Sequence, residues 1–162
     1  MSITELPTQH LAEQARQLVQ FIRDEIPMAR AMDVRLGSCD DDHIELLAPL
    51  APNVNDKGGA FGGSLVSVMT INGWALVELA LRQHDEDCDL FVSESSMHYL
   101  APITSDFRSQ ARLSAQADWA TFFRTLDARG KARIEVNCTI TDEQGKPAAT
   151  LRARYVAKRR DA

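Results

Sequence analysis

The sequence lacks the features that mark a secreted, metal-binding or nucleic-acid-binding protein. Its three cysteines, Cys39, Cys88 and Cys138, form no C-x-x-C pair and no metal-like spacing with the four histidines. We therefore expect no metal site and a reducing compartment. No basic region followed by an apolar stretch opens the chain, which predicts no secretory signal and a cytoplasmic protein. The formal charge of -5 leaves no dominant basic patch, so nucleic acid is not an expected partner.

A membrane-spanning segment and a second domain are also missing. The longest apolar run, residues 65–81, is interrupted by Asn72, Gly73 and Glu78 and is slightly short for a bilayer. We expect a core helix there and no membrane partner. The 162 residues, 44% of them hydrophobic, contain no repeat, linker or low-complexity block. A single domain over residues 1–162 is the expectation.

The spacing of apolar residues changes along the chain between helical and strand periods. Steps of three and four predict an amphipathic helix from about residue 8 to 27, and residues 62–81 predict a helix that is apolar on every side and must be enclosed. Alternation predicts two strands between these helices, with a turn at residues 40–42. A short helix ending near Gly130 interrupts the later strands. The strands are predicted over residues 32–36, 44–46, 90–100, 107–115, 133–140 and 151–155. This order predicts an α+β domain with an antiparallel sheet wrapped around the long central helix.

A glycine-rich stretch leads directly into the predicted central helix. It reads N-D-K-G-G-A-F-G-G-S from Asn55 to Ser64. The first amides of a helix have no partner within it and carry the positive end of its dipole, so those of Gly62, Gly63 and Ser64 can donate to an oxyanion. Glycine also lets a substrate approach the backbone closely. The stretch predicts a binding site at the helix start, and a flexible loop before a packed helix is the alternative.

The same stretch resembles a known family. The string N-x-x-G-x-x-F-G-G from Asn55 is similar to the N-x-x-G-x-x-H-G-G signature of hot-dog acyl-CoA thioesterases, with Phe61 in place of histidine. The longer string N-V-N-D-K-G-G-A-F-G-G-S-L resembles the thioesterases related to the C-terminal domain of YiiD, in which phenylalanine is expected. The stretches E-S-S-M-H-Y-L-A-P from Glu94 and K-A-R-I-E-V from Lys131 resemble that family too, so the likeness covers nearly the whole chain after about Ala12.

The resemblance implies a hot-dog fold, a homodimer that extends the sheet across subunits, and active sites at the dimer interface. A helix that is apolar on every side in so small a chain independently favours a second subunit. Whether dimers pair into tetramers stays open.

Thioester hydrolysis needs a polarised carbonyl and a carboxylate that activates water or attacks directly. In the related thioesterases with a His-Gly-Gly signature the carboxylate lies further along the helix, and the matching residue here is Thr70. Asp56 in the loop and Glu94 in the third predicted strand remain as catalytic candidates, with Asn55 holding the water or the carbonyl. A turn-forming role is the alternative for Asp56 and Asn55, and an edge-strand charge is the alternative for Glu94. The expected substrate-binding residues are Phe61, Gly62, Gly63 and Ser64.

These residues predict hydrolysis of an acyl thioester. Coenzyme A or phosphopantetheine would be part of the substrate, and no separate cofactor is expected. An acyl-thioester dehydratase or hydratase is one alternative, although it normally pairs a histidine with an acid and Phe61 occupies the position of one such histidine. A non-catalytic acyl-CoA-binding domain is the other, because Thr70 is not an acid. The acyl chain length and the choice between coenzyme A and acyl-carrier protein stay open.

Overall fold

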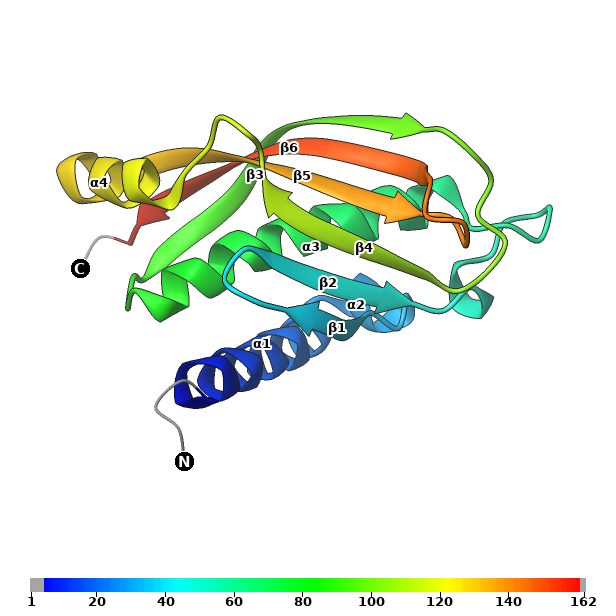
Figure 1. The fold of residues 1–162 in the computed structure, drawn as a ribbon, viewed down its shortest axis with the longest axis horizontal. Helices are drawn as coiled ribbons and strands as arrows, with labels where there is room; N and C mark the ends of the chain where they lie inside the picture. The colour runs from blue at the N-terminus through cyan, green and yellow to red at the C-terminus, as the bar shows by residue number, and fades with distance from the viewer. Residues whose placement is uncertain (1–4, 161–162) are drawn as a thin grey trace.

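The computed structural model describes residues 5–160, and two helices open this part of the chain (Figure 1). α1 (Glu5–Glu25) buries one apolar stripe, because steps of three and four residues return to the same helix face. The stripe consists of Leu11, Ala15, Leu18 and Ile22. The predicted first helix is confirmed. Pro27 has no amide hydrogen with which to continue α1, and it begins the short helix α2 (Pro27–Ala31).

The six strands form one antiparallel sheet in the order β1-β2-β4-β5-β6-β3. Their bounds are β1 (Arg35–Cys39), β2 (His43–Ala48), β3 (Cys88–Tyr99), β4 (Phe107–Leu113), β5 (Lys131–Thr141) and β6 (Pro147–Arg159). Buried and exposed residues alternate along β5 and β6, so one face of the sheet covers the core and the other faces solvent. The first strand begins later than predicted, because Met32 caps α2.

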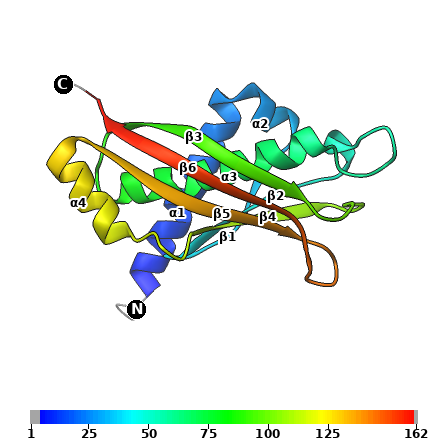
Figure 2. The same cartoon turned by 90° about the horizontal axis from the view of Figure 1, so that it is seen from above.

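The inner face of the sheet packs on α3 (Gly62–Gln83), which runs beneath the strands in both views (Figures 1 and 2). Three bonds tie the middle of α3 to different strands: the Tyr155 hydroxyl donates to the Thr70 carbonyl, the Cys138 thiol to the Met69 carbonyl, and the Asn72 amide to Ser109. The length and hydropathy of α3 would suit a membrane span, but 61% of its most apolar 18-residue window is buried inside the protein. It is therefore the core helix that the sequence predicts.

One side of α3 is less covered than the others. Val66, Ile71 and Trp74 are only partly buried and pack against the edge of the core. Beside them lies β3, the last strand of the sheet, whose outer edge has no neighbouring strand among the described residues. Phe91 and Val92 on this strand are exposed. The chain thus encloses α3 incompletely, along a free sheet edge that carries apolar side chains.

The predicted short helix is confirmed as α4 (Trp119–Arg129), and its two ends explain its length. Asp118 caps the first turn by accepting from the Thr121 amide at 2.7 Å. Gly130 ends the helix in the left-handed conformation at φ 67°, which glycine adopts without steric cost.

Candidate active site

The loop before α3 is held in shape by Asn55. Its side-chain oxygen accepts from the backbone amides of Lys57 at 2.8 Å and Gly59 at 3.0 Å. The backbone amide of Asn55 donates to the Gly59 carbonyl at 2.7 Å. Gly58 sits inside this turn at φ 83°. The oxygen of Asn55 is therefore engaged in the turn, which is the alternative role that the sequence left open for this residue.

The first three amides of α3 have no acceptor. Phe61 precedes the helix in an extended conformation, its own amide donates to the Asn53 carbonyl at 2.7 Å, and its side chain makes no cap. The Leu65 amide makes the first bond inside the helix, to the Phe61 carbonyl. Within residues 5–160, no acceptor satisfies the amides of Gly62, Gly63 or Ser64. This is the arrangement that suits an oxyanion at the positive end of the helix dipole.

Two aromatic rings pack on the paired glycines. A Cβ at Gly62 would lie 3.3 Å from the Tyr99 ring, and the Tyr99 hydroxyl donates to the Gly62 carbonyl at 3.2 Å. A Cβ at Gly63 would lie 2.5 Å from the Phe61 ring, closer than a real methyl group can approach. Phe61 itself is 55% exposed. Glycine at both positions lets the two aromatic rings pack directly against the backbone at the start of α3.

A groove of about 560 Å3 opens at the start of α3 and is lined by Gly62, the first of these three residues. One wall is the loop that holds Ala60, the floor includes Gly62 and Leu65 of α3, and the other wall is the segment that follows β3. That segment contributes Tyr99, Leu100, Ala101, Pro102, Ile103 and Thr104. The Ala60 amide donates to the Ile103 carbonyl at 2.7 Å and joins the two walls. Lys57 is the one charged residue of the lining, so the groove suits an uncharged apolar chain.

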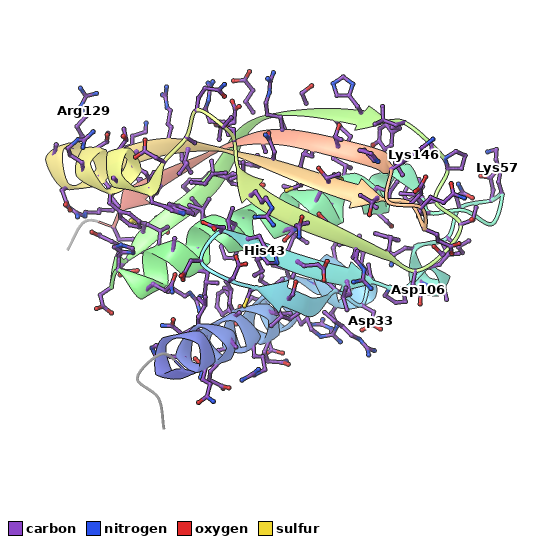
Figure 3. All side chains as sticks on the ribbon, in the orientation of Figure 1. Asp33, His43, Lys57, Asp106, Arg129 and Lys146 are labelled. Atoms are coloured by element: carbon purple, nitrogen blue, oxygen red, sulfur yellow. The ribbon has the colours of Figure 1, made fainter. Side chains whose placement is uncertain are left out.

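Asp56 lies at the tip of the loop. Its side chain is 80% exposed, and its carboxylate contacts the ammonium of Lys57 at 3.2 Å. Figure 3 shows Lys57 at the far end of the molecule, where the loop projects beyond α3. Asp56 is thus on the same end of the molecule as the groove, and the groove lining itself does not include it.

Glu94 faces the opposite side of the sheet from α3. Val92 pairs with the buried Tyr155, but a bulge at Ser93 shifts the register, and Glu94 pairs with the exposed Arg154. Since paired residues share one face of a sheet, Glu94 points to the solvent face. Its carboxylate lies 3.2 Å from the Arg154 guanidinium and its side chain is 72% exposed. The fold of the chain therefore does not bring Asp56 and Glu94 together.

Two further polar residues of α3 are already bonded. The Thr70 hydroxyl donates to the Val66 carbonyl at 2.7 Å, and Glu78 pairs with Arg82 at 3.0 Å. Burial raises the pKa of Glu78, although Arg82 opposes the shift. Tyr99 was not among the predicted site residues. The signal that could have found it is the apolar pair Tyr99 and Leu100, which follows a polar stretch at the end of a strand.

A larger cavity, of about 660 Å3, lies near the other end of α3. Its lining carries the five acids Glu78, Asp85, Glu86, Asp87 and Asp89 against Arg82 and Arg160. It contains no unpaired helix amide and an excess of negative charge, which disfavours an anionic intermediate. No cluster of three or more histidine, cysteine or acidic side chains suited to a metal ion occurs in the described part of the chain. The groove at the start of α3 is therefore the candidate active site.

Known proteins resemble this chain over most of its length. The family described as "Putative thioesterase (yiiD_Cterm)" matches residues 15–159. A solved protein of unknown function from Chlorobaculum tepidum TLS is 30% identical, with a TM-score of 0.85 over 90% of this chain and 94% of its own. A "putative thioesterase" from Shewanella oneidensis is 28% identical, with a TM-score of 0.81 over 91% of this chain and 99% of its own. The predicted hot-dog architecture, an antiparallel sheet wrapped around a long helix, is confirmed.

Proposed function

The chain belongs to the YiiD C-terminal thioesterase family, and from that membership we propose that it hydrolyses acyl thioesters in the groove at the start of α3. The observation that carries the proposal is the set of three unpaired amides, Gly62 to Ser64, the first of which belongs to a residue that lines an apolar groove. The amides would hold the carbonyl oxygen as it gains negative charge. The acyl chain would lie between Leu65 and the segment after Tyr99, away from water.

In the proposed reaction a water attacks the thioester carbonyl while a carboxylate takes its proton. The carbon–sulfur bond then breaks, the sulfur leaves as a thiolate that gains a proton, and a carboxylic acid is released. Coenzyme A or a phosphopantetheine arm is the thiol product. We favour Asp56 over Glu94 as the base, because Glu94 faces the solvent side of the sheet beside Arg154 and Asp56 lies in the loop that forms a wall of the groove.

The proposed assembly is a homodimer that pairs β3 with its copy. β3 offers 12 residues of unpaired edge and carries the exposed Phe91 and Val92, and Trp74 on the less covered side of α3 donates to the Leu90 carbonyl of this strand. A second sheet edge would satisfy the unpaired backbone groups of β3. It would also cover the exposed apolar side chains of this strand and the partly buried side of α3. Because Tyr99 ends β3 and lines the groove, the groove would lie beside the interface.

The dimer is tested by adding a charge to the strand edge. Val92→Lys should convert a dimer into a monomer in light scattering coupled to size exclusion, because a lysine on an edge strand opposes pairing. Asn137→Lys places the same charge on the solvent face of the central strand β5 and should leave the mass unchanged. A mass of four chains for the unmodified protein would identify a tetramer, and a monomeric unmodified protein would contradict the assembly.

The activity is tested by thiol release from a panel of acyl-CoA thioesters. Asp56→Asn should lower kcat by about 10²-fold or more, as expected when a general base is lost. Glu94→Gln should retain activity, and Glu143→Gln serves as the matched control at an exposed turn outside the groove lining. Loss only in Glu94→Gln would assign the base to Glu94, and full activity in both candidates would reject a carboxylate mechanism.

Binding without turnover is the second candidate function. The observation that favours it is the position of Asp56, which is 80% exposed and paired with Lys57 instead of facing the groove. Saturable binding of acyl-CoA with no free thiol after prolonged incubation of the unmodified protein would select this function. The test distinguishes the two candidates because only the hydrolase consumes its ligand.

A further inference from the structure

Far from the groove, the β1–β2 hairpin brings a serine, a histidine and a carboxylate together. We propose that Ser38 is an activated nucleophile, with His43 as its base and Asp40 as the group that orients His43, and that it accepts acyl or phosphonyl groups from small activated esters. Figure 3 shows His43 at the start of β2, away from the end of the molecule that carries Lys57. The proposal is therefore independent of the thioesterase site.

The three side chains have the connectivity of a nucleophile, a base and an orienting acid. The Ser38 hydroxyl lies 3.0 Å from Nε2 of His43, within hydrogen-bond distance. On the other side of the ring, Nδ1 lies 2.7 Å from a carboxylate oxygen of Asp40. That second contact is short but bent away from ideal hydrogen-bond geometry. Such contacts commonly align only when substrate is bound, and the electrostatic attraction acts at this distance in either case.

A β-bulge explains why Ser38 reaches His43. Leu36 pairs with Leu46 and Cys39 pairs with Ile44, so Gly37 and Ser38 both stand opposite Glu45. The extra residue turns Ser38 to the face of the hairpin that carries His43. Gly37 is needed beside it, because a Cβ there would lie 2.5 Å from the Glu45 carboxylate. Bulges of this kind re-aim side chains and are frequent next to active sites.

The charge on Asp40 fixes which nitrogen of His43 carries the proton. Burial raises the pKa of Asp40, but the Asp42 amide at 2.8 Å, the His43 side chain and the His43 amide at 2.9 Å together outweigh it and hold the pKa below its usual range. The carboxylate is therefore charged at neutral pH and favours the proton on Nδ1. Nε2 is then the acceptor that faces the Ser38 hydroxyl, as general base catalysis requires.

The exposure of the two side chains also fits these roles, because a substrate must reach the nucleophile and not the base. His43 is buried, with 11% of its side-chain surface exposed, while Ser38 is exposed to solvent. In the proposed step the Ser38 oxygen forms a bond to the ester carbonyl carbon, and its proton passes to Nε2 of His43. The bond from that carbon to the leaving oxygen breaks, and the leaving alcohol takes the proton from His43. With a fluorophosphonate, the Ser38 oxygen bonds to phosphorus instead, the phosphorus–fluorine bond breaks, and fluoride leaves with the proton from His43. Water then hydrolyses the acyl-serine through the same base and regenerates the hydroxyl.

The surroundings of Ser38 define the substrate class. The serine stands on an open hairpin surface, outside both the groove and the larger cavity. No cavity beside Ser38 would hold a long acyl chain, so substrate binding contributes little to the reaction rate. The ester must therefore carry a good leaving group. Aryl acetates and fluorophosphonates are the chemical class that meets this requirement, because their leaving groups depart without strong stabilisation by the protein.

The experiment is fluorophosphonate labelling of the full chain, read by mass spectrometry of its peptides. Ser96 is the matched control, since it is an exposed serine on β3 with no bonded histidine among the described residues. Ser38 should be labelled about 10-fold faster than Ser96 or more. Ser38→Ala should abolish that label and keep thiol release from acyl-CoA unchanged.

Asp40→Asn separates activation from folding, because an asparagine oxygen can accept the same two backbone amides while losing the charge. It should slow Ser38 labelling by about 10-fold or more, with an unchanged circular dichroism spectrum. Labelling of Ser38 at the rate of Ser96 would overturn the proposal, and so would an Asp40→Asn variant that reacts as fast as the unmodified protein. Either result would mean that the three residues only stabilise the hairpin.

Discussion

Replacing Gly73 by alanine should lower the unfolding temperature, although alanine is the better helix former. Gly73 lies in the buried middle of α3, and a Cβ there would overlap the Tyr155 hydroxyl and lie 2.9 Å from two carbons of its ring. Tyr155 is fully buried, so its ring has no free space to enter. Its hydroxyl also donates to the Thr70 carbonyl at 2.7 Å, and moving the ring would break this bond.

The size of the effect follows from these contacts. Overpacking a core costs about 1–3 kcal/mol, and a lost hydrogen bond adds about 0.5–1.5 kcal/mol. The higher helix propensity of alanine returns about 1 kcal/mol. We expect a net loss of about 1–3 kcal/mol in the free energy of unfolding, which corresponds to a fall in Tm of roughly 2–12 °C for a domain of this size.

Gly63→Ala in the same helix is the matched control. Its Cβ would collide with the Phe61 ring at 2.5 Å, but that ring is 55% exposed and can turn into solvent. We expect stability to change by no more than about 0.5 kcal/mol. Thiol release should fall instead, because the displaced ring and the new methyl group lie beside the unpaired amides.

Differential scanning calorimetry and urea unfolding measure both variants, with thiol release as the activity readout. The reasoning about packing would be refuted if Gly73→Ala unfolded at or above the temperature of the unmodified protein. It would also be refuted if Gly63→Ala lost as much stability as Gly73→Ala, because burial of the neighbouring ring would then not decide the cost.

Three further outcomes are expected. Asp118→Ala should lower Tm by about 2–4 °C at neutral pH, and equal Tm values would contradict this. The Thr121 amide holds the pKa of Asp118 below 3.8, so the difference should shrink as pH falls below 3.8. Iodoacetamide should modify Cys39 before Cys138, because Cys138 is buried and burial raises its pKa to about 12; peptide mass spectrometry showing the reverse order would be inconsistent with the core. Burial also raises the pKa of Tyr155 above its usual 10. The contribution of Tyr155 to the free energy of unfolding should therefore be fully present below pH 10 and decline as the pH rises above it. In urea titrations, Tyr155→Phe should weaken that decline.

The sequence predicted the elements whose side chains obey one period throughout. Steps of three and four identify α1, and strict alternation identifies β5 and β6, because each of these elements buries a single face. The C-terminal end of α4 was equally readable, since Gly130 is a residue type that stops a helix. In these elements the structure favoured by the local sequence is the same as the one favoured by packing in the core.

The direction of Glu94 could not be read in the same way. Alternation from Leu90 through Val92 would place Glu94 on the inner face, toward α3. The bulge at Ser93 adds one residue to the strand and reverses every side chain beyond it. A bulge is a choice of hydrogen-bond register between two strands, and β6 lies more than 50 residues away in sequence. The bulge that joins Ser38 to His43 is also a choice of register, although its two strands are neighbours in the sequence.

The bulge in β3 also shapes the groove. It turns Glu94 outward and, by the same reversal, turns Tyr99 inward, where its hydroxyl reaches the Gly62 carbonyl. Without the extra residue, Tyr99 would face solvent and the start of α3 would lose its contact with the sheet edge. One local irregularity thus removes an acid from the inner face and supplies an aromatic wall beside the unpaired amides. It follows that the carboxylate for the proposed hydrolysis must come from the loop before α3, or from a second copy paired along β3, and not from the inner face of β3 itself.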